Sequence, residues 1–348
     1  AVAGTHGKTT TSTLVSWLNH AAAGEGSAFL GGVSKNFDSN LVLGTGRRLA
    51  VEADEFDRSF LQLNPDLAVV TSADADHLDI YGTHEAVKEA FSQFIDRIKA
   101  GGALVMKQGV DVEVRNSGIT TYRYSFNEPT DFYAKNLKLL PTGHYTFDIV
   151  TPFGVIEECT LGIPGWVNVE NAVAAVALFV LAERSEGKEV DSDALRAALA
   201  SFTGVKRRFE FYVNTPKAVY MDDYAHHPRE LSAAITSVAK MFPGRRLTAV
   251  FQPHLYTRTR DLYREFAEAL SLADEVVLLP IYPARELPIE GIESEIIAEL
   301  VTAPCTIVER EALAETLARM DTDVVVTFGA GNIDAYCQAV ADVIAKKG

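Results

Sequence analysis

Short apolar runs alternate with segments of helical periodicity along most of the 348-residue chain. Apolar runs between helices are typical of strands in a mostly parallel sheet that is covered on both faces. The predicted strands of the first half are Ala28–Leu30, Leu49–Glu52, Leu67–Thr71 and Ala103–Met106. Those of the second half are Ala218–Met221, Leu247–Phe251, Val276–Leu279, Thr306–Val308 and Val324–Phe328. The alternation predicts an α/β protein.

Roughly 150 residues per domain is usual, so the length indicates two domains. In the first, helices are predicted over Thr9 to about His20, Val169–Glu183 and Ser192–Ser201, with an edge hairpin over Tyr145–Val150 and Val155–Leu161. Gly204 ends the last of these helices, and a basic run leads to a new strand. We therefore place the boundary between residues 204 and 205, and the strand–helix alternation predicts a doubly wound, Rossmann-like second domain over 205–348.

Composition excludes several classes of function. Asp and Glu number 47 against 32 Lys and Arg, a net charge of −15, which argues against binding to nucleic acid or to an anionic membrane. No apolar run reaches the ~20 residues that span a bilayer, and no basic-plus-apolar segment suggests secretion, so we expect none. Cys159, Cys305 and Cys337 are widely spaced, as suits a reducing compartment. We expect a cytoplasmic protein.

The sharpest motif is Gly4-Thr-His-Gly-Lys-Thr-Thr10. Its glycines let backbone N–H groups turn toward phosphate oxygens, and the following helix directs its positive end there. Lys8 would reach the β- and γ-phosphates, and the Thr9 hydroxyl would bind Mg²⁺. The motif predicts a P-loop ATPase domain, with a plain glycine-rich turn as the alternative. Only Ala1–Ala3 precede it, so we expect an upstream segment to be missing.

Two acidic clusters follow predicted strands, at the edge where ligands of parallel sheets bind. Glu52-Ala-Asp-Glu55 closes one strand, and Glu52 is a plausible Mg²⁺ ligand. Asp74-Ala-Asp-His77-Leu-Asp79 follows the next, and His77 among carboxylates could complete a second metal position. A solvated acidic loop and an exposed loop histidine are the alternatives.

Polar clusters also end two strands of the second half. Met221-Asp-Asp-Tyr-Ala-His-His-Pro228 and Phe251-Gln-Pro-His-Leu-Tyr-Thr-Arg-Thr-Arg260 gather His and charge where a ligand cleft should open. Arg258 and Arg260 could clamp a carboxylate or phosphate. Polar loops before helices are the alternative, and Gly329-Ala-Gly-Asn332 is read as tight packing.

Together these motifs resemble the Mur ligases, ATP-dependent amide-forming enzymes of peptidoglycan synthesis. The matching pieces are Gly4–Thr10, Glu52–Glu55, Asp76–Asp79, Pro164-Gly-x-x-Asn168-x-x-Asn171-Ala, Arg208-Phe-Glu and Asp222-Asp-Tyr-x-His-His-Pro228. The resemblance implies three domains, of which this chain holds the central ATP-binding domain (1–204) and the C-terminal amino-acid-binding domain (205–348), without the N-terminal UDP-binding domain.

Within the family, the Phe251–Asp261 and Ala75–Tyr81 stretches resemble the member that joins L-alanine to UDP-N-acetylmuramate through an acyl phosphate. Ala225 also occurs in the sibling that attaches a recycled tripeptide, which is the nearest alternative. The implied partners are small molecules, and the implied state is a monomer or weak homodimer.

The resemblance also implies residue roles. Thr9 would hold the metal beside the γ-phosphate, and Glu52 and His77 a second one, so two Mg²⁺ ions are expected, with Mn²⁺ able to substitute. Catalytic roles fall to Lys8, Glu52, His77, His226 and Arg258. ATP would be bound by Gly4, Thr5, His6, Gly7, Lys8, Thr9, Thr10, Asn168, Asn171, Arg208 and Asp223. The amino acid would lie near Tyr224, His226, His254 and Arg258, and domain closure is expected to assemble the site.

Two other classes remain open. A catalytically lapsed nucleotide-binding module would be expected to lose Lys8, Glu52 or His77 first, and all three are present. A P-loop kinase or GTPase would need no second doubly wound domain with polar clusters of its own.

Overall fold

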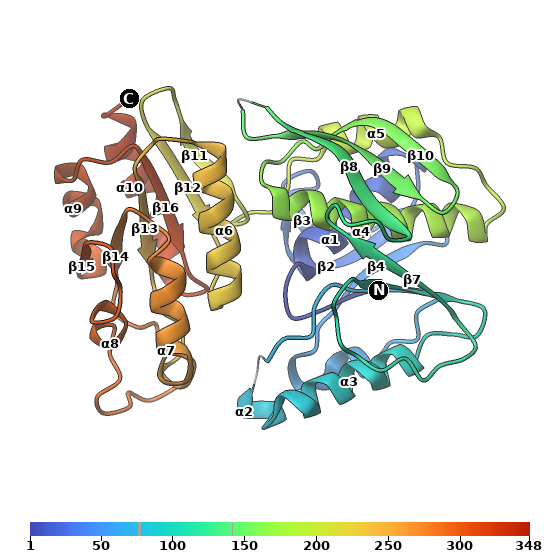
Figure 1. Ribbon diagram of the computed structural model, residues 1–348, viewed down its shortest axis with the longest axis horizontal. Coiled ribbons are helices and arrows are strands. Elements are labelled where there is room, and N and C mark those ends of the chain that lie inside the picture. Colours follow the sequence, from blue (N-terminus) through green and yellow to red (C-terminus); the bar gives the residue numbers. More distant parts are fainter. Residues whose placement is uncertain (76–77, 141) are drawn as a thin grey trace. The chain divides into compact units, whose positions relative to one another are not determined.

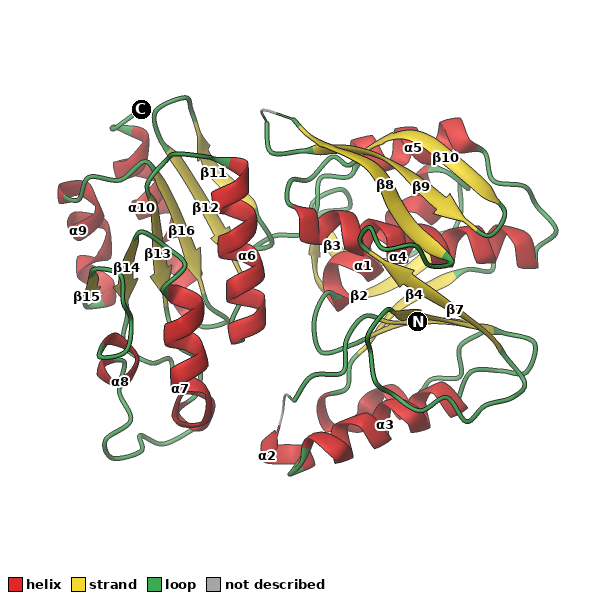
Figure 2. Ribbon diagram, viewed as in Figure 1, coloured by secondary structure: helices red, strands yellow, loops and turns green. Residues whose placement is uncertain are grey.

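The computed structural model describes residues 1–75, 78–140 and 142–348. The chain forms two compact units, Ala1–Lys206 and Arg207–Gly348 (Figure 1), and the expected boundary lies two residues before this division. Each unit is an α/β structure with one sheet and helices on its faces (Figure 2). The α/β fold class is confirmed.

The sheet of the first unit has ten strands among the described residues. In spatial order they are β10 (Gly154–Thr160), β9 (Tyr145–Thr151), β8 (Phe132–Leu139), β7 (Thr120–Ser125), β6 (Ala103–Lys107), β5 (Leu67–Val70), β1 (Val2–Ala3), β4 (Leu49–Ala53), β2 (Ser27–Ser34) and β3 (Ser39–Val42). The strands from β8 through β2 pair in parallel, and antiparallel pairs close both edges. The predicted hairpin forms the β9–β10 edge.

Strand β1 lies at the centre of this sheet between β4 and β5. Val2 is level with Glu52 on one side and with Val69 on the other. The three strands run in the same direction, so their carboxyl ends meet at one edge. The phosphate loop and the segments that directly follow β4 and β5 therefore leave the sheet side by side.

Helices cover both faces of the first sheet. They are α1 (Lys8–Ala21), α2 (Leu78–Tyr81), α3 (His84–Asp96), α4 (Trp166–Ser185), α5 (Ser192–Ser201) and the 3₁₀ segment η1 (Phe56–Gln62). Val69 and Val105 pack with α1, α4 and α5, whereas their neighbours Val70 and Met106 pack with α3 and η1. This alternation explains why the central strands are apolar throughout.

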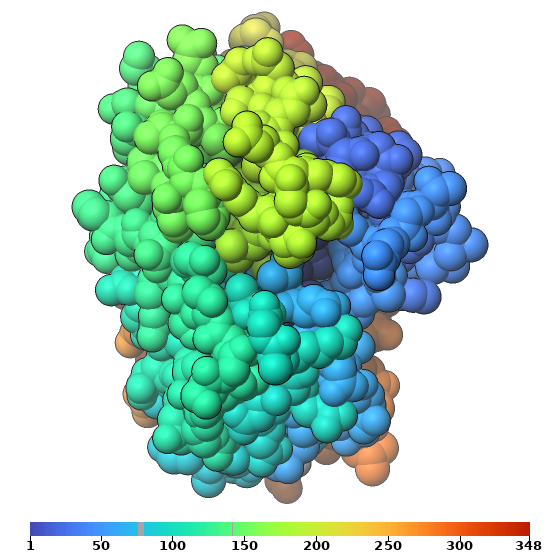
Figure 3. Space-filling model, turned by 90° about the vertical axis from the view of Figure 1, so that its right-hand side faces the viewer, coloured from blue at the N-terminus to red at the C-terminus, as the bar shows by residue number. Residues whose placement is uncertain are grey.

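Helix α4 forms the middle of the larger core. Among the described residues it is the one helix long and apolar enough to cross a membrane, and 78% of its apolar window is buried inside the protein. We assign it to the core. Nearby, residues 185–200 lie beside residues 20–50 on the surface (Figure 3), where Arg48 pairs with Glu183 and Glu186 at 2.6 and 2.8 Å.

The second unit has a six-stranded sheet within the described residues. Its order is β11 (Glu210–Asn214), β12 (Val219–Asp223), β16 (Val324–Phe328), β13 (Leu247–Phe251), β14 (Glu275–Leu278) and β15 (Cys305–Ile307). Only the β11–β12 pair is antiparallel. The helical segments are α6 (Pro228–Met241), α7 (Tyr256–Leu270), α8 (Glu295–Ala298), η2 (Arg310–Ala312), α9 (Leu313–Arg319), η3 (Asn332–Tyr336) and α10 (Cys337–Ala345). The five strands predicted for this half all form.

Candidate functional site

The phosphate loop leaves the centre of the first sheet between β1 and α1 and is tied to the end of β5. The Thr5 hydroxyl and the His6 amide both donate to the Ser72 hydroxyl oxygen, at 2.9 and 2.8 Å. Gly4 has φ of 140°, and a Cβ there would lie 2.0 Å from Oγ1 of Thr71. Glycine is therefore required for this path.

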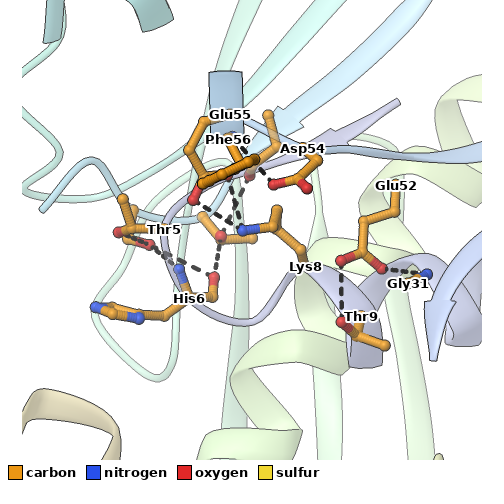
Figure 4. Close-up of polar contacts among 12 residues, drawn as sticks. Thr5, His6, Lys8, Thr9, Gly31, Glu52, Asp54, Glu55 and Phe56 are labelled. Atoms are coloured by element: carbon orange, nitrogen blue, oxygen red, sulfur yellow. Dashed lines mark hydrogen bonds and ion pairs between the residues drawn. The ribbon is translucent and has the colours of Figure 1, made fainter. Parts of the chain in front are cut away.

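Lys8 opens α1 and contacts the segment that follows β4 (Figure 4). Its Nζ donates to Oε1 of Glu55 at 3.0 Å and forms an ion pair with Oε2 at 2.8 Å. The Glu55 side chain is 1% exposed and that of Lys8 14%. Burial opposes the charge of Lys8, but the Glu55 carboxylate outweighs burial and raises the pKa of Lys8 above its ordinary value. Lys8 is thus an ammonium ion, as phosphate binding requires.

Thr9 and Glu52 lie together beside Lys8 (Figure 4). The Thr9 hydroxyl donates to Oε1 of Glu52 at 3.0 Å, and the Gly31 amide donates to Oε2 at 2.8 Å. A Cβ at Gly31 would lie 2.4 Å from Oε1, so only glycine lets β2 approach the carboxylate this closely. Hydroxyl and carboxylate oxygens are the donors that Mg²⁺ prefers, so the pair fits a magnesium ion beside nucleotide phosphates.

The third expected metal ligand, His77, lies outside the described residues. Within the ranges that the structure describes, no group of three or more His, Cys, Asp or Glu side chains is arranged to hold a metal ion. The segment before His77 does reach the phosphate loop, because Oδ2 of Asp74 lies 3.2 Å from Nε2 of His6.

The two predicted asparagines lie at the start of α4, and one touches the phosphate loop. Nδ2 of Asn168 donates to the Pro164 carbonyl at 2.6 Å, and Nδ2 of Asn171 donates to Oδ1 of Asn168 at 3.4 Å. A Cβ at Gly7 would lie 2.8 Å from Oδ1 of Asn171. The structure thus brings Asn171 against the loop. Thr10 is buried in the first turn of α1.

In the second unit, predicted residues gather at the carboxyl end of β12. The Asp223 carboxylate accepts hydrogen bonds from the amides of Phe209 and Ala225, both at 2.8 Å. Burial raises the pKa of Asp223 to about 6, although the Arg208 charge opposes this. The Arg208 guanidinium lies 5.1 Å from the centre of the Tyr224 ring.

A second group in this unit joins the ends of β12 and β13. The rings of His226 and His254 lie 6.3 Å apart, and Nδ1 of His226 lies 3.0 Å from the Tyr224 carbonyl oxygen. His254 stacks on Tyr282 at 5.7 Å. Burial, followed by the charge of Arg258, lowers the pKa of His254 to about 4, so this imidazole is neutral near pH 7.

Arg260 does not join this group, because it is exposed and donates to Asp261 at 2.7 Å. Of the two arginines expected to bind a carboxylate or phosphate, only Arg258 therefore remains a candidate. At Gly329 a Cβ would lie 2.7 Å from the Gln252 carbonyl oxygen, which supports tight packing as the role of that turn.

Three neighbours of the site were not singled out from the sequence: Gly31, Glu55 and Tyr282. Glu55 stands within a motif that was recognised, and its position after a predicted strand was the available signal. Gly31 and Tyr282 carry no such signal. Gly31 meets Glu52 because β2 pairs with β4, and Tyr282 meets His254 through an isolated bridge, and neither pairing can be read from the sequence.

The first unit is therefore a phosphate-loop nucleotide-binding fold, followed by a doubly wound unit with polar clusters of its own. The chain belongs to the Mur ligase family: the model of the Mur ligase middle domain matches residues 2–179, and that of the Mur ligase, glutamate ligase domain matches residues 207–331. The UDP-N-acetylmuramate–L-alanine ligase of Parabacteroides distasonis is 47% identical over 349 residues, covering 99% of this chain and 74% of the relative. The enzyme of the same name from Phocaeicola vulgatus is 44% identical and covers 99% and 75%.

Solved structures share the fold over the whole chain. The UDP-N-acetylmuramate-alanine ligase of Thermotoga maritima has a TM-score of 0.78 at 23% identity, covering 100% of this chain and 75% of that one. The MurF ligase of Thermotoga maritima in complex with ADP has a TM-score of 0.72 at 20% identity, covering 100% and 80%.

Proposed function

We propose that this protein joins L-alanine to UDP-N-acetylmuramate at the expense of ATP, in peptidoglycan synthesis. Relatives of that name match nearly the whole chain at 42–47% identity. The structural observation that carries the proposal is the meeting of Lys8, Thr9 and Glu52 where β1 and β4 end. A cation, a hydroxyl and a carboxylate are the groups that phosphoryl transfer from ATP requires there.

The reaction has two steps. A carboxylate oxygen of the sugar attacks the γ-phosphorus of ATP, ADP leaves, and an acyl phosphate forms. The alanine ammonium first loses a proton, the resulting amine attacks the acyl carbon, inorganic phosphate leaves, and the nitrogen gives up a second proton. Both phosphate and carboxylate are anions, so Lys8 stabilises their approach.

Thr9 and Glu52 would hold Mg²⁺, and Glu52 and His77 a second ion, with Mn²⁺ able to substitute. Bound there, the ions supply positive charge that neutralises the transferring phosphoryl group. The remaining loop residues (Gly4, Thr5, His6, Gly7, Thr10) would bind the phosphates through backbone amides and hydroxyls, and Asn168 and Asn171 would lie toward the base.

The second unit would supply the amino-acid site. Arg258 is suited to pair with the alanine carboxylate. Because His254 is neutral, it does not repel the alanine ammonium. Tyr224 and His226 would complete this site, and Arg208 and Asp223 would contact the nucleotide. We further propose that the protein acts in the cytoplasm on small molecules, as a monomer or weak homodimer.

The test is phosphate release from ATP by the full-length protein, with UDP-N-acetylmuramate and one candidate amine at a time. We expect release that depends on L-alanine. Phosphate release that depends on the tripeptide and not on L-alanine would indicate that the protein catalyses the recycling reaction instead. Measurable ATP binding without release for any amine would indicate a lapsed enzyme.

A further inference from the structure

We infer that Glu55 is the positioning residue that holds Lys8 for phosphate binding, an inference that rests on the proposed ATP-dependent function. Lys8 carries three N–H donors on Nζ, and both oxygens of Glu55 lie within hydrogen-bond distance of that atom. A two-point contact fixes where the ammonium lies, whereas a lone lysine side chain would sample many rotamers. It also leaves a donor for a phosphate oxygen.

Glu55 is itself held rigidly. Its carbonyl oxygen accepts the hydroxyl of Tyr81 at 2.5 Å and the amide of Arg58 at 2.9 Å. Phe60, one turn further on, is 1% exposed and stacks on Phe94 at 5.0 Å. The carboxylate is therefore presented to Lys8 from a packed segment and not from a mobile loop.

The backbone after Glu55 is unusual in a way that fits this role. Asp57 and Arg58 have φ of 52° and 56°, in the left-handed region that non-glycine residues rarely adopt. Such residues cost about 1–3 kcal/mol each and are found mainly where the surroundings enforce them at functional sites. Here the turn lets the chain leave β4 while the Glu55 side chain stays in contact with Lys8.

A purely structural ion pair is the competing explanation. A buried pair adds little net stability, because desolvation of both charges offsets their attraction. This pair joins the first residue of α1 to the segment that follows β4, next to the Thr9–Glu52 contact. The two strand ladders around β1 already hold the fold at this point, so the ion pair is not needed for that purpose. We therefore assign it to the orientation of Lys8.

Glu55→Gln tests the inference, and Asp54→Asn is the matched control. Both changes remove one negative charge from the same motif, but Asp54 is exposed, its carboxylate accepts the Phe56 amide at 3.2 Å, and its effect on the charge of Lys8 is smaller than that of Glu55. For Glu55→Gln we expect the Kd and KM for ATP to rise roughly tenfold or more, as for loss of a charged hydrogen-bond partner. The KM for L-alanine should stay within about twofold, since that site is built from other residues. Asp54→Asn should keep all constants within about twofold.

Wild-type turnover with L-alanine, measured in parallel, separates this inference from the proposed function. If the wild type is active and Glu55→Gln binds ATP as tightly, the inference is wrong. It is also wrong if Glu55→Gln raises the KM values of ATP and L-alanine equally, because that pattern signals a general structural defect. Should the variant not fold, a wild-type crystal structure with Mg²⁺ and a non-hydrolysable ATP analogue decides. Lys8 bonded to both Glu55 and phosphate is expected, and Lys8 turned away from Glu55 overturns the inference.

Discussion

The hydroxyl of Thr9 and the carboxylate of Glu52 lie 3.0 Å apart, although 42 residues separate them in the chain. The contact joins the first turn of α1 to the last residues of β4. It exists because β4 pairs with β1 in parallel, so that both strands deliver their next residues to the same edge. The order of the strands in the sheet therefore brings these two residues together. We expect substitution of either residue to weaken metal binding.

Replacing the Glu52 carboxylate should weaken metal-dependent catalysis more than it weakens the fold. For Glu52→Gln we expect kcat to fall roughly 100-fold and the Mg²⁺ concentration for half-maximal rate to rise, because the amide brings no charge to the cation. Phosphate release measured across a Mg²⁺ titration checks this. Ser12→Ala is the control, since Ser12 reaches Glu52 only at 3.4 Å. An unchanged Mg²⁺ dependence in Glu52→Gln would contradict the assignment.

Adding a methyl group at Gly31 should displace the Glu52 carboxylate without unfolding the protein. The new Cβ would lie 2.4–2.5 Å from the carboxylate atoms, which form the far end of a flexible side chain and can move. We expect Gly31→Ala to lower kcat at least about tenfold through the lost Thr9 contact, with the unfolding free energy changed by less than about 1 kcal/mol. Gly118→Ala, whose nearest neighbour lies at 3.4 Å, should change neither quantity. A stability loss that matches the activity loss would count against this explanation.

The imidazole of His254 should remain neutral well below its ordinary pKa. Burial is the first cause of its pKa of about 4, and the charges of Arg258 and Arg285 add to it. NMR titration of the histidine ring protons measures this directly. In Arg258→Gln the pKa should rise but stay below 6.5, because the larger cause, burial, is untouched. A wild-type pKa near 6.5 would show that the ring is solvated.

The stability of the second unit should depend on the titration of Asp223. Burial raises its pKa from 3.8 to about 6, so the folded protein binds this proton more tightly than the unfolded chain does. The stabilisation from that proton is fully present below pH 3.8 and is lost as the pH rises to about 6, a change of about 3 kcal/mol.

Asp223→Asn cannot titrate, so relative to the wild type it should become more stable by up to about 3 kcal/mol between pH 4 and pH 6. Urea denaturation of both proteins side by side at each pH checks this. Asp321→Asn, at an exposed position, serves as the control. A difference between Asp223→Asn and the wild type that does not vary with pH would refute the prediction.

Much of the fold could be predicted from local pattern. The apolar runs at β13 and β16 match the structure residue for residue, because central parallel strands are apolar on both faces. Strands β3, β7 and β8 escaped prediction. The exposed positions of β7 are threonines, β3 has no buried residue, and Phe132–Leu139 is buried only in its first half, so no continuous apolar run marks these strands.

The candidate site was predictable only where a motif carries its own signal. Lys8, Thr9 and Glu52 follow from the phosphate loop and from an acid at a strand end. Which acid meets which side chain depends on register: Glu52 reaches Thr9, whereas Glu55, three residues on, reaches Lys8. Which carboxylate contacts which side chain cannot be predicted from the spacing alone. The turn after β4 contains residues in the left-handed region, and because they are not glycines the sequence gives no sign of the turn.

The central position of β1, paired on both sides, has a consequence for how nucleotide is bound. Its two residues are paired on both sides, and Thr71 also donates its amide to the Ala3 carbonyl at 3.0 Å. The loop that follows is anchored to a strand paired on both sides and is hydrogen-bonded to Ser72, so its local opening should cost more free energy than the opening of a loop at the sheet edge. An incoming nucleotide would therefore meet a loop that is already ordered, and little of its binding free energy would be consumed in ordering the backbone.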